Sequence, residues 1–414
     1  MASLLLSDTF LPRIGGRENY YHHLFSNLPQ EKTIVLTPDY QGNWSLHDAN
    51  YPLPVYRVEK LSQLWHRWGR PGRWRWFKTL LPLIRQYQID LVHCGLVLPD
   101  GLTGWWLKQT LGLPYIVYTH GKEILENQAD AEKAQLMSIV LLAASRVVSN
   151  SYYTSDLVAQ LGVPAARRVV IHPGIVPAQW QTAPNPMRTE QLREQHRISH
   201  CPVLLSVGRL IERKGHDMVI KALPDILQRH PETVYVIVGE GPACDLLVSL
   251  AENLGVSQAV RFVGEVKNED LSAYYALADI FVMVSRQPLG SHEVEGFGIV
   301  YLEANACGLA VVAGRSGGVP DAVVDGETGL LVDPFSFQGV AEAIGRLLND
   351  SALRQTLGQQ GKNRAIADFD WVQASQRLQT EIEQVRAETA KPHLIPQVWR
   401  TLPRLLQKSA FDLS

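Results

Sequence analysis

Short apolar runs rich in β-branched residues recur along the chain, and segments with helical periodicity separate them. The runs cover residues 2–7, 32–38, 89–95, 114–120, 146–151 and 168–174, and then 202–209, 233–241, 259–266, 279–285, 309–314 and 329–333. Continuous apolar strands that alternate with helices are typical of parallel sheets covered on both faces. The pattern therefore predicts an α/β protein built from doubly wound sheets.

The runs are too many for one sheet of ordinary size. The segment 176–201, "VPAQWQTAPNPMRTEQLREQHRISHC", interrupts them and is rich in proline and polar residues. We therefore predict a Rossmann-like domain at 1–175, a linker at 176–201, and a second Rossmann-like domain at 202–370. Residues 371–414 are predicted to form a helix that crosses back to the first domain, followed by a tail.

Composition narrows the class of protein. The chain has 414 residues, of which 46% are hydrophobic and 19% charged, as expected for a well-buried globular protein. A net charge of −2 argues against nucleic acid as a partner, so an anionic ligand needs local positive groups. The four cysteines lack C-x-x-C spacing, which argues against a zinc site or disulfides. No apolar run approaches about 18 residues. We expect a cytoplasmic protein, with any membrane contact peripheral at the inner face.

Glycines and charged residues follow several predicted strands. Ligands of doubly wound sheets bind outside the carboxyl ends of the strands. Gly16 follows the first run, His120 ends the fourth, and Gly208, Arg209 and Lys214 follow the first run of the second half. The planar fork of Arg209 and the point charge of Lys214 suit a diphosphate. The alternative is ordinary surface charge.

The stretch 292–305, "HEVEGFGIVYLEAN", places Glu295 and Glu303 around a glycine-flanked turn that opens a helix at Ile299. Backbone N–H groups at a helix start bind phosphate or hydroxyl oxygens. Eight helical residues span about 12 Å, whereas a glycosidase pair needs about 5–9.5 Å. The spacing favours an elongated ligand with hydroxyls at both ends, such as a nucleotide sugar. The alternative is one capping and one surface glutamate.

Two other nucleotide sites are disfavoured. "VGEGPACD" has Gly239 and Gly241, but Cys244 stands at the third glycine position of a dinucleotide fingerprint. The sequence also lacks a G-x-x-x-x-G-K-[ST] loop. Hydride transfer and nucleoside triphosphate hydrolysis therefore lose most of their support.

Together, "PRIGG", "THGKE", "GRLIERKG", "VGEGP" and "EGFGIVYLEA" resemble the retaining GT-B glycosyltransferases of family four over about residues 10–375. The stretch 292–318 resembles the branch with GDP-mannose-dependent phosphatidylinositol mannosyltransferases. The resemblance implies two Rossmann-like domains facing an interdomain cleft. It also implies a retaining transferase without metal or cofactor. This enzyme would move a sugar, with mannose or glucose favoured, from a GDP- or UDP-linked donor to a lipid, glycan or small-molecule acceptor.

The resemblance also implies roles for residues. Arg209 and Lys214 would hold the donor diphosphate, with Gly16 approaching it from the first domain. Glu303 would bind the ribose, and His120 would lie beside the sugar and the reacting centre. The other donor-binding residues are Gly208, Gly239, Val263 (at the base), Glu295, Gly296, Phe297, Gly298 and Ile299. The catalytic set is His120, Glu295, Arg209 and Lys214.

One loop departs from the mannosyltransferase pattern. "GGRENY" places Arg17 and Glu18 where those enzymes carry an apolar residue and then Gln. These two residues, with Tyr20 and His120, are predicted on the acceptor side. The departure leaves the acceptor open.

The stretch 64–81, "LWHRWGRPGRWRWFKTLL", gathers tryptophans and basic residues. This combination is typical of a surface that rests on anionic lipid. The predicted contact residues are Trp68, Arg70, Arg73, Trp74, Arg75 and Trp76. Internal packing of the tryptophans is the alternative. A rival for the whole chain is a catalytically silent protein that binds a nucleotide sugar or a membrane surface.

Overall fold

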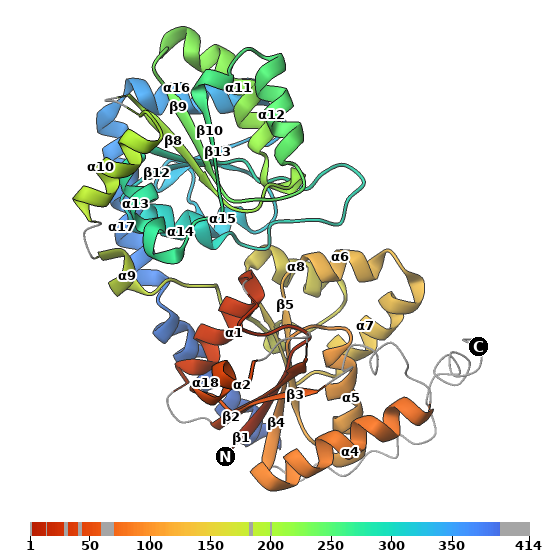
Figure 1. Ribbon diagram of the computed structural model, residues 1–414. Coiled ribbons are helices and arrows are strands. Elements are labelled where there is room, and N and C mark those ends of the chain that lie inside the picture. The colour runs from red at the N-terminus through yellow and green to blue at the C-terminus, as the bar shows by residue number, and fades with distance from the viewer. Residues whose placement is uncertain are drawn as a thin grey trace. The chain divides into compact units, whose positions relative to one another are not determined.

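The computed structural model describes residues 2–13, 15–28, 32–39, 44–58, 70–181, 185–198 and 201–389, except for the side chains of 70–78 and 268. The chain forms two compact units. The first unit comprises Met1–Asn150, Ser155–Ile171 and Val372–Ser414, and the second comprises Ser151–Thr154 and His172–Trp371. Each unit has its own parallel sheet with helices around it (Figure 1).

The first unit has a seven-stranded sheet in the order β3-β2-β1-β4-β5-β6-β7, in which every pair of neighbours is parallel. Its strands are β1 (Ala2–Leu6), β2 (Lys32–Pro38), β3 (Val55–Val58), β4 (Ile89–Cys94), β5 (Tyr115–Thr119), β6 (Arg146–Ser149) and β7 (Arg168–Val170). Its helices are α1 (Gly16–Ser26), α2 (Ser45–Ala49), α4 (Arg70–Tyr87), α5 (Asp100–Leu111), α6 (Lys122–Gln128), α7 (Ala131–Ala143), the 3-10 helix η1 (Ala165–Arg167) and α18 (Trp371–Thr389). Helix α8 (Tyr152–Gln160) begins in the second unit and continues in the first. The strand order reverses between β1 and β4.

The second unit has a six-stranded parallel sheet in the order β10-β9-β8-β11-β12-β13. Its strands are β8 (Val203–Val207), β9 (Val234–Val238), β10 (Val260–Gly264), β11 (Ile280–Met283), β12 (Ala310–Gly314) and β13 (Gly329–Val332). Its helices are α9 (Pro177–Gln181), α10 (Pro186–Gln195), η2 (Glu212–Lys214), α11 (His216–Arg229), α12 (Cys244–Asn253), η3 (Ser257–Ala259), α13 (Asn268–Leu277), α14 (Ile299–Ala306), α15 (Val319–Ala322), α16 (Phe337–Asn349) and α17 (Ser351–Asp368). Here the order reverses between β8 and β11, the topology that places a ligand at the carboxyl ends of those two strands.

The predicted class is confirmed, and each predicted run contains a strand. Strand β3 was not predicted, because it has four half-buried residues at the sheet edge and prolines precede it. The segment 176–201 contains α9 and α10 and belongs to the second unit. Its prolines start helices: Pro186 is the first residue of α10, and the Asn185 side chain accepts a hydrogen bond from the Met187 N–H. Proline is favoured there because the first helical N–H has no partner within the helix.

The second sheet is buried on both faces, and neighbouring residues of a strand point to opposite sides. Leu204 and Val282 join the cluster with α11, α12 and α16, whereas Leu205 and Phe281 join the cluster with α13 and α14. Figure 1 shows these helices on the two faces of the sheet. Each fully buried aliphatic or phenylalanine side chain contributes roughly 1.5–3 kcal/mol. The continuous apolar strands of the sequence therefore fix the three-layer arrangement.

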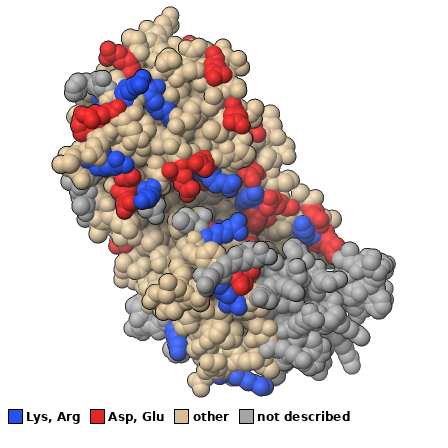
Figure 2. Space-filling view, viewed as in Figure 1, with Lys and Arg blue, Asp and Glu red and all other residues tan. Residues whose placement is uncertain are grey.

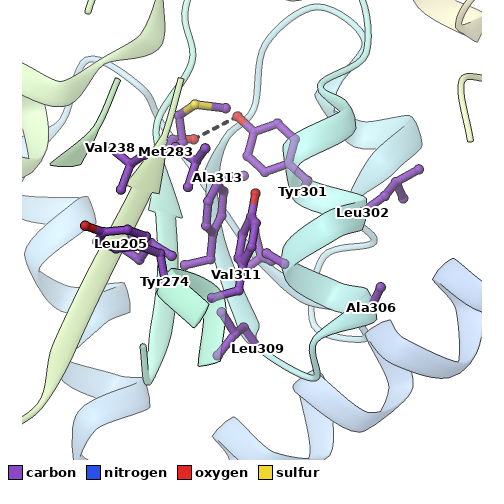
Figure 3. Close-up of a cluster of buried hydrophobic side chains, with 14 of the residues drawn as sticks. Leu205, Val238, Tyr274, Met283, Tyr301, Leu302, Ala306, Leu309, Val311 and Ala313 are labelled. Atoms are coloured by element: carbon purple, nitrogen blue, oxygen red, sulfur yellow. Dashed lines mark hydrogen bonds between the residues drawn. The ribbon is translucent and has the colours of Figure 1, made fainter. Parts of the chain in front are cut away.

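Helix α14 is anchored on this sheet by its apolar face (Figure 3). Figure 3 shows Tyr301 pointing toward the strands, whereas Leu302 and Ala306 point away from them on the other side of the helix; all three are fully buried. The Tyr301 hydroxyl donates to the Met283 carbonyl at 2.8 Å, at the end of β11. The anchor fixes where α14 begins, and therefore where the turn 295–298 before it lies.

Helix α18 belongs to the first unit, although it follows the second in sequence. The Ser375 hydroxyl donates to the Leu24 carbonyl, and Arg386 pairs with Asp90. The buried Arg146 pairs with Glu381 at 2.8 Å and with Glu388 at 2.6 Å. Among the helices that the structure describes, none is long and apolar enough to cross a bilayer.

Candidate active site

Lys214 and Glu295 lie together in the second unit. Lys214 belongs to the segment after β8, and Glu295 to the segment after β11, the two strands at which the order reverses. The Lys214 ammonium donates to the Glu295 carboxylate at 2.6 Å; Glu295 is buried and Lys214 is largely buried. The fold therefore brings together two predicted site residues that are 81 positions apart.

Arg213 is the second cation on the Glu295 carboxylate. Its Nη1 donates to the same oxygen, Oε2, at 2.7 Å, and its Nε lies 3.4 Å from Glu293. The Ser285 hydroxyl donates to Oε2 at 3.3 Å. Burial opposes ionisation of Glu295, but the charges of Lys214 and Arg213 outweigh it and lower its pKa to about 2. Glu295 is therefore a carboxylate at neutral pH.

Arg286 also connects the segment after β11, where it lies, to the segment after β8. It follows β11, is buried, and pairs with Asp217 at 2.8 Å, at the start of α11. Its backbone N–H donates to the Arg213 carbonyl at 2.8 Å. Arg213, in the segment after β8, thus pairs with Glu295 in the segment after β11, and Arg286, after β11, pairs with Asp217 at the start of α11. These two ion pairs hold the segments together and so fix Lys214 relative to Glu295.

Glu303 lies in a different environment from Glu295. It is the fifth residue of α14 and accepts a hydrogen bond from the Tyr275 hydroxyl at 2.8 Å. Burial raises its pKa, while Tyr275 and the charge of Lys214 oppose the change. Lys214 thus acts electrostatically on both glutamates, and only Glu295 pairs with it directly.

Glycines position the turn that carries Glu295. The Gly318 N–H donates to the Glu295 carbonyl at 2.9 Å. A Cβ on Gly318 would lie 2.0 Å from the Gly296 carbonyl oxygen. Gly298 precedes α14 with φ +96, a conformation that residues other than glycine rarely adopt. The glycines therefore allow residues 295–298 to lie directly on the 315–318 loop.

The other predicted donor-binding residues surround the sheet ends. Arg209 is exposed, and Gly208 and Gly239 pack backbone to backbone, with a Gly239 Cβ only 2.1 Å from the Gly208 oxygen. Val263 in β10 is partly buried. The Phe297 side chain is core, lying 5.4 Å from the His172 ring, whereas Ile299 begins α14 and is partly exposed.

The predicted residues of the first unit gather where its own strand order reverses. Gly16 starts α1, and a Cβ there would meet open space. Arg17 pairs with Asp8, which follows β1, at 3.2 Å. Glu18 is buried, with Oε2 2.3 Å from where a Gly15 Cβ would be, so its carboxylate lies over the start of α1. This placement resembles a helix-capping acid.

Tyr20 and its neighbour Tyr21 make hydrogen bonds to different partners. Tyr20, predicted on the acceptor side, is buried, and its hydroxyl donates to the Ile171 carbonyl at 2.9 Å. Tyr21, which was not predicted, reaches the His120 ring nitrogen Nε2 at 2.6 Å. The backbone N–H of His120 donates to the Glu123 carboxylate at 2.5 Å. Burial and the nearby Arg17 charge lower the pKa of His120 to about 3, so His120 is neutral near pH 7.

The predicted membrane-contact residues lie outside what the structure describes. This holds for Trp68 entirely and for the side chains of Arg70, Arg73, Trp74, Arg75 and Trp76, whose backbone is the start of α4. On the face seen in Figure 2, acidic and basic residues of the described part are interspersed, which agrees with the small net charge.

Sequence reasoning missed Arg213, Ser285, Tyr275, Tyr21 and Glu123. Arg213 and Glu123 stand in stretches already singled out, "ERKG" and "HGKE". A charged residue beside a predicted site residue was the signal for both. Ser285, Tyr275 and Tyr21 carry no such signal, because hydroxyl residues near strand and helix ends are common.

Comparison with known proteins gives the family. Residues 14–179 match the description "Glycosyltransferase Family 4", and residues 188–364 match "Glycosyl transferases group 1". The chain is 33% identical over 386 residues to the GDP-mannose-dependent alpha-(1-6)-phosphatidylinositol monomannoside mannosyltransferase of Mycolicibacterium smegmatis, covering 91% of this chain and 96% of that protein. It is 31% identical over 306 residues to the D-inositol 3-phosphate glycosyltransferase of Corynebacterium aurimucosum, covering 70% of each.

Solved structures show the same fold. The Anabaena protein Alr3699/HepE, solved in complex with UDP, superposes with a TM-score of 0.79 at 22% identity, over 93% of this chain and 100% of that one. The predicted GT-B class is thereby confirmed. The chain belongs to glycosyltransferase family 4 and is a glycosyltransferase.

Proposed function

We propose that the protein moves a mannosyl group from GDP-mannose to a hydroxyl of an acceptor that contains inositol phosphate. The pairing of Lys214 and Arg213 with the buried Glu295 is the observation that supports a donor site in the second unit. The choice of GDP-mannose and of the acceptor follows the names of the relatives. Glucose from UDP-glucose is the second choice for the donor.

In this proposal the donor diphosphate lies against Lys214 and Arg209. An ammonium has three N–H donors, so Lys214 can keep Glu295 and still donate to a phosphate oxygen. Negative charge grows on the β-phosphate as the sugar leaves, and a preorganised cation stabilises that charge. Glu295, kept ionised, accepts hydrogen bonds from hydroxyls of the transferred sugar, and Glu303 accepts from the ribose.

Transfer proceeds with retention and without a metal ion. The acceptor oxygen attacks the anomeric carbon on the face from which the nucleotide leaves. The bond from that carbon to the β-phosphate oxygen breaks, and the bond to the acceptor oxygen forms. The acceptor proton passes to the leaving β-phosphate oxygen, which releases GDP. His120 contacts the sugar during this step.

The test offers GDP-mannose and UDP-glucose with vesicles that contain phosphatidylinositol or its monomannoside, and with soluble inositol phosphate. We expect an α-linked mannosyl product with one of these acceptors and GDP-mannose. A β-linked product would refute retention. Binding of GDP-mannose with neither transfer nor hydrolysis would favour the rival, a catalytically silent binding protein.

We further propose that the stretch 64–81 rests on anionic lipid, a proposal supported by its sequence alone. Each basic residue near such a surface contributes roughly 1 kcal/mol. Wild-type protein should sediment with acidic vesicles and less so as salt rises. Replacing Arg70, Arg73 and Arg75 by Ser should abolish sedimentation but leave hydrolysis of the soluble donor intact. Wild-type protein that ignores acidic vesicles at low salt would contradict the proposal.

A further inference from the structure

Two neighbouring tyrosines of α1 enclose the His120 ring. The Tyr20 ring lies edge-on to it at 5.5 Å and the Tyr21 ring at 5.7 Å. Both tyrosines are buried, with relative exposures of 2% and 1%. The ring of His120 is therefore held in one orientation, and each tyrosine brings a hydroxyl into its surroundings.

The two hydroxyls make different hydrogen bonds. The Tyr20 hydroxyl donates to the Ile171 carbonyl at 2.9 Å. The Tyr21 hydroxyl contacts two groups, the Gly95 carbonyl and the His120 Nε2. Gly95 follows β4 and His120 follows β5, which are adjacent strands of the first sheet. Tyr21 thus links the ends of two strands through one oxygen.

The Gly95 carbonyl, the Tyr21 hydroxyl and the His120 ring share two hydrogen bonds, and only one placement of their protons satisfies both. A phenol has one proton, and burial raises the pKa of Tyr21 well above its usual value, so that proton stays on it. The Gly95 carbonyl can only accept, so it takes the phenol proton. The Tyr21 oxygen must then accept from His120, which places a hydrogen on Nε2. The opposite tautomer would set two lone pairs against each other at the Gly95–Tyr21 or the Tyr21–His120 contact.

His120 is neutral, because burial and the Arg17 charge lower its pKa to about 3. A neutral imidazole carries one N–H, and which nitrogen carries it is set by the partner of the other. With hydrogen on Nε2, Nδ1 keeps its lone pair and is an acceptor. A sugar hydroxyl is a donor that such a nitrogen can orient.

We propose that Tyr21 is a positioning residue that fixes His120 as the Nε2–H tautomer, so that Nδ1 accepts a hydrogen bond from a hydroxyl of the transferred sugar. The role given to Nδ1 rests on the proposed function, whereas the tautomer does not. Tyr21 acts through His120 and needs no contact with the substrate.

The test reads the tautomer in the resting protein. Histidine labelled with ¹⁵N distinguishes a protonated from an unprotonated ring nitrogen in long-range ¹H–¹⁵N correlation spectra. The His120→Gln spectrum assigns the His120 signals among the 13 histidines. We expect wild-type His120 to show protonated Nε2 and unprotonated Nδ1 near pH 7. Protonated Nδ1 in wild-type protein would overturn the proposal.

Tyr21→Phe and Tyr20→Phe are a matched pair, because each keeps its ring against His120 and loses one hydroxyl. Tyr21→Phe should give averaged signals for the two nitrogens, and Tyr20→Phe should keep the wild-type pattern. An unchanged His120 pattern in Tyr21→Phe would overturn the proposal. If Tyr21→Phe does not fold, the wild-type spectrum alone still decides.

Kinetics give a second readout. Tyr21→Phe should lower kcat for sugar transfer on the order of tenfold, the low end of what loss of a histidine-orienting partner costs at metal sites. Affinity for GDP, which lacks the sugar, should not change. If GDP-mannose proves not to be the donor, kcat cannot be measured with it, but the spectrum still tests the tautomer of His120.

Discussion

The Glu295 carboxylate pairs with two cations, Lys214 and Arg213, so replacing it by glutamine has a calculable effect. Glu295→Gln keeps the size of the side chain and removes its charge. Lys214 and Arg213, with 12% and 18% of their side chains exposed, then stay largely buried beside a neutral amide. Removing one member of a buried ion pair is costly because the partner charge is left uncompensated.

The size of the effect follows from the pKa of Glu295. That pKa is lowered from 4.5 to about 2, and one pKa unit corresponds to about 1.4 kcal/mol. The folded state thus gains about 3 kcal/mol from ionised Glu295. Because the folded-state pKa is the lower one, this stability is complete above about pH 5 and is lost as pH falls from about 4.5 to about 2. By pH 3, about 2 kcal/mol of it should be gone.

Urea unfolding of both proteins between pH 7 and pH 3 measures this contribution. We expect Glu295→Gln to be about 3 kcal/mol less stable at pH 7, with the gap closing to about 1 kcal/mol at pH 3. Glu293→Gln is the matched control: Glu293 also faces Arg213, but at 3.4 Å and with 37% of its side chain exposed. It should change stability by no more than about 0.5 kcal/mol. Equal stability of wild type and Glu295→Gln at pH 7 would refute the electrostatic account.

Three further predictions concern other parts of the molecule. Gly318→Ala should lower kcat/KM about tenfold or more and cost about 1–3 kcal/mol, because its Cβ would lie 2.0 Å from the Gly296 oxygen. The control is Gly345→Ala in α16, where a Cβ meets open space, and it should not destabilise the protein. Equal losses of activity in Gly318→Ala and Gly345→Ala would contradict the reasoning. Arg146→Met should lower the free energy of unfolding by about 2 kcal/mol, because it removes the ion pairs to Glu381 and Glu388 of α18. An equal loss from Lys122→Met, which removes an exposed pair, would argue against Arg146 as a specific anchor of α18. Transfer activity should persist in EDTA, since cationic side chains stabilise the leaving group, and loss that magnesium or manganese restores would refute this.

The strands and the Lys214–Glu295 region could be predicted because both follow from strong signals. Parallel strands are buried on both faces, so their apolar runs stand out even at five residues, as in β8 and β9. Lys214 and Glu295 follow strands whose carboxyl ends meet at the reversal of strand order. The edge strand β3 lacks such a run, since its four residues are half-buried.

The finer assignments depended on side-chain directions that a sequence does not give. Adjacent helical residues point about 100° apart, so whether Tyr20 or Tyr21 reaches His120 depends on how α1 is rotated on the sheet. The structure gives Tyr21 that position. Arg213 and Lys214 both reach Glu295 because the short helix η2 turns both toward it. Its conformation depends on contacts with the segment after β11, which only the fold brings near.

Calorimetric titration of wild type and Lys214→Ala with GDP tests the central claim, that the donor diphosphate binds at the ends of β8 and β11. GDP keeps the diphosphate and lacks the sugar, so the affinity that Lys214→Ala loses for GDP reports on the diphosphate contact and not on the sugar. A hydrogen bond from a charged group contributes about 1.5–3 kcal/mol, so Lys214→Ala should weaken GDP binding by roughly ten- to a hundredfold. The Lys221→Ala variant, which removes a lysine on α11 whose side chain is 40% exposed and pairs with Asp217, should bind as wild type does. Wild-type affinity in Lys214→Ala would contradict the placement of the donor site.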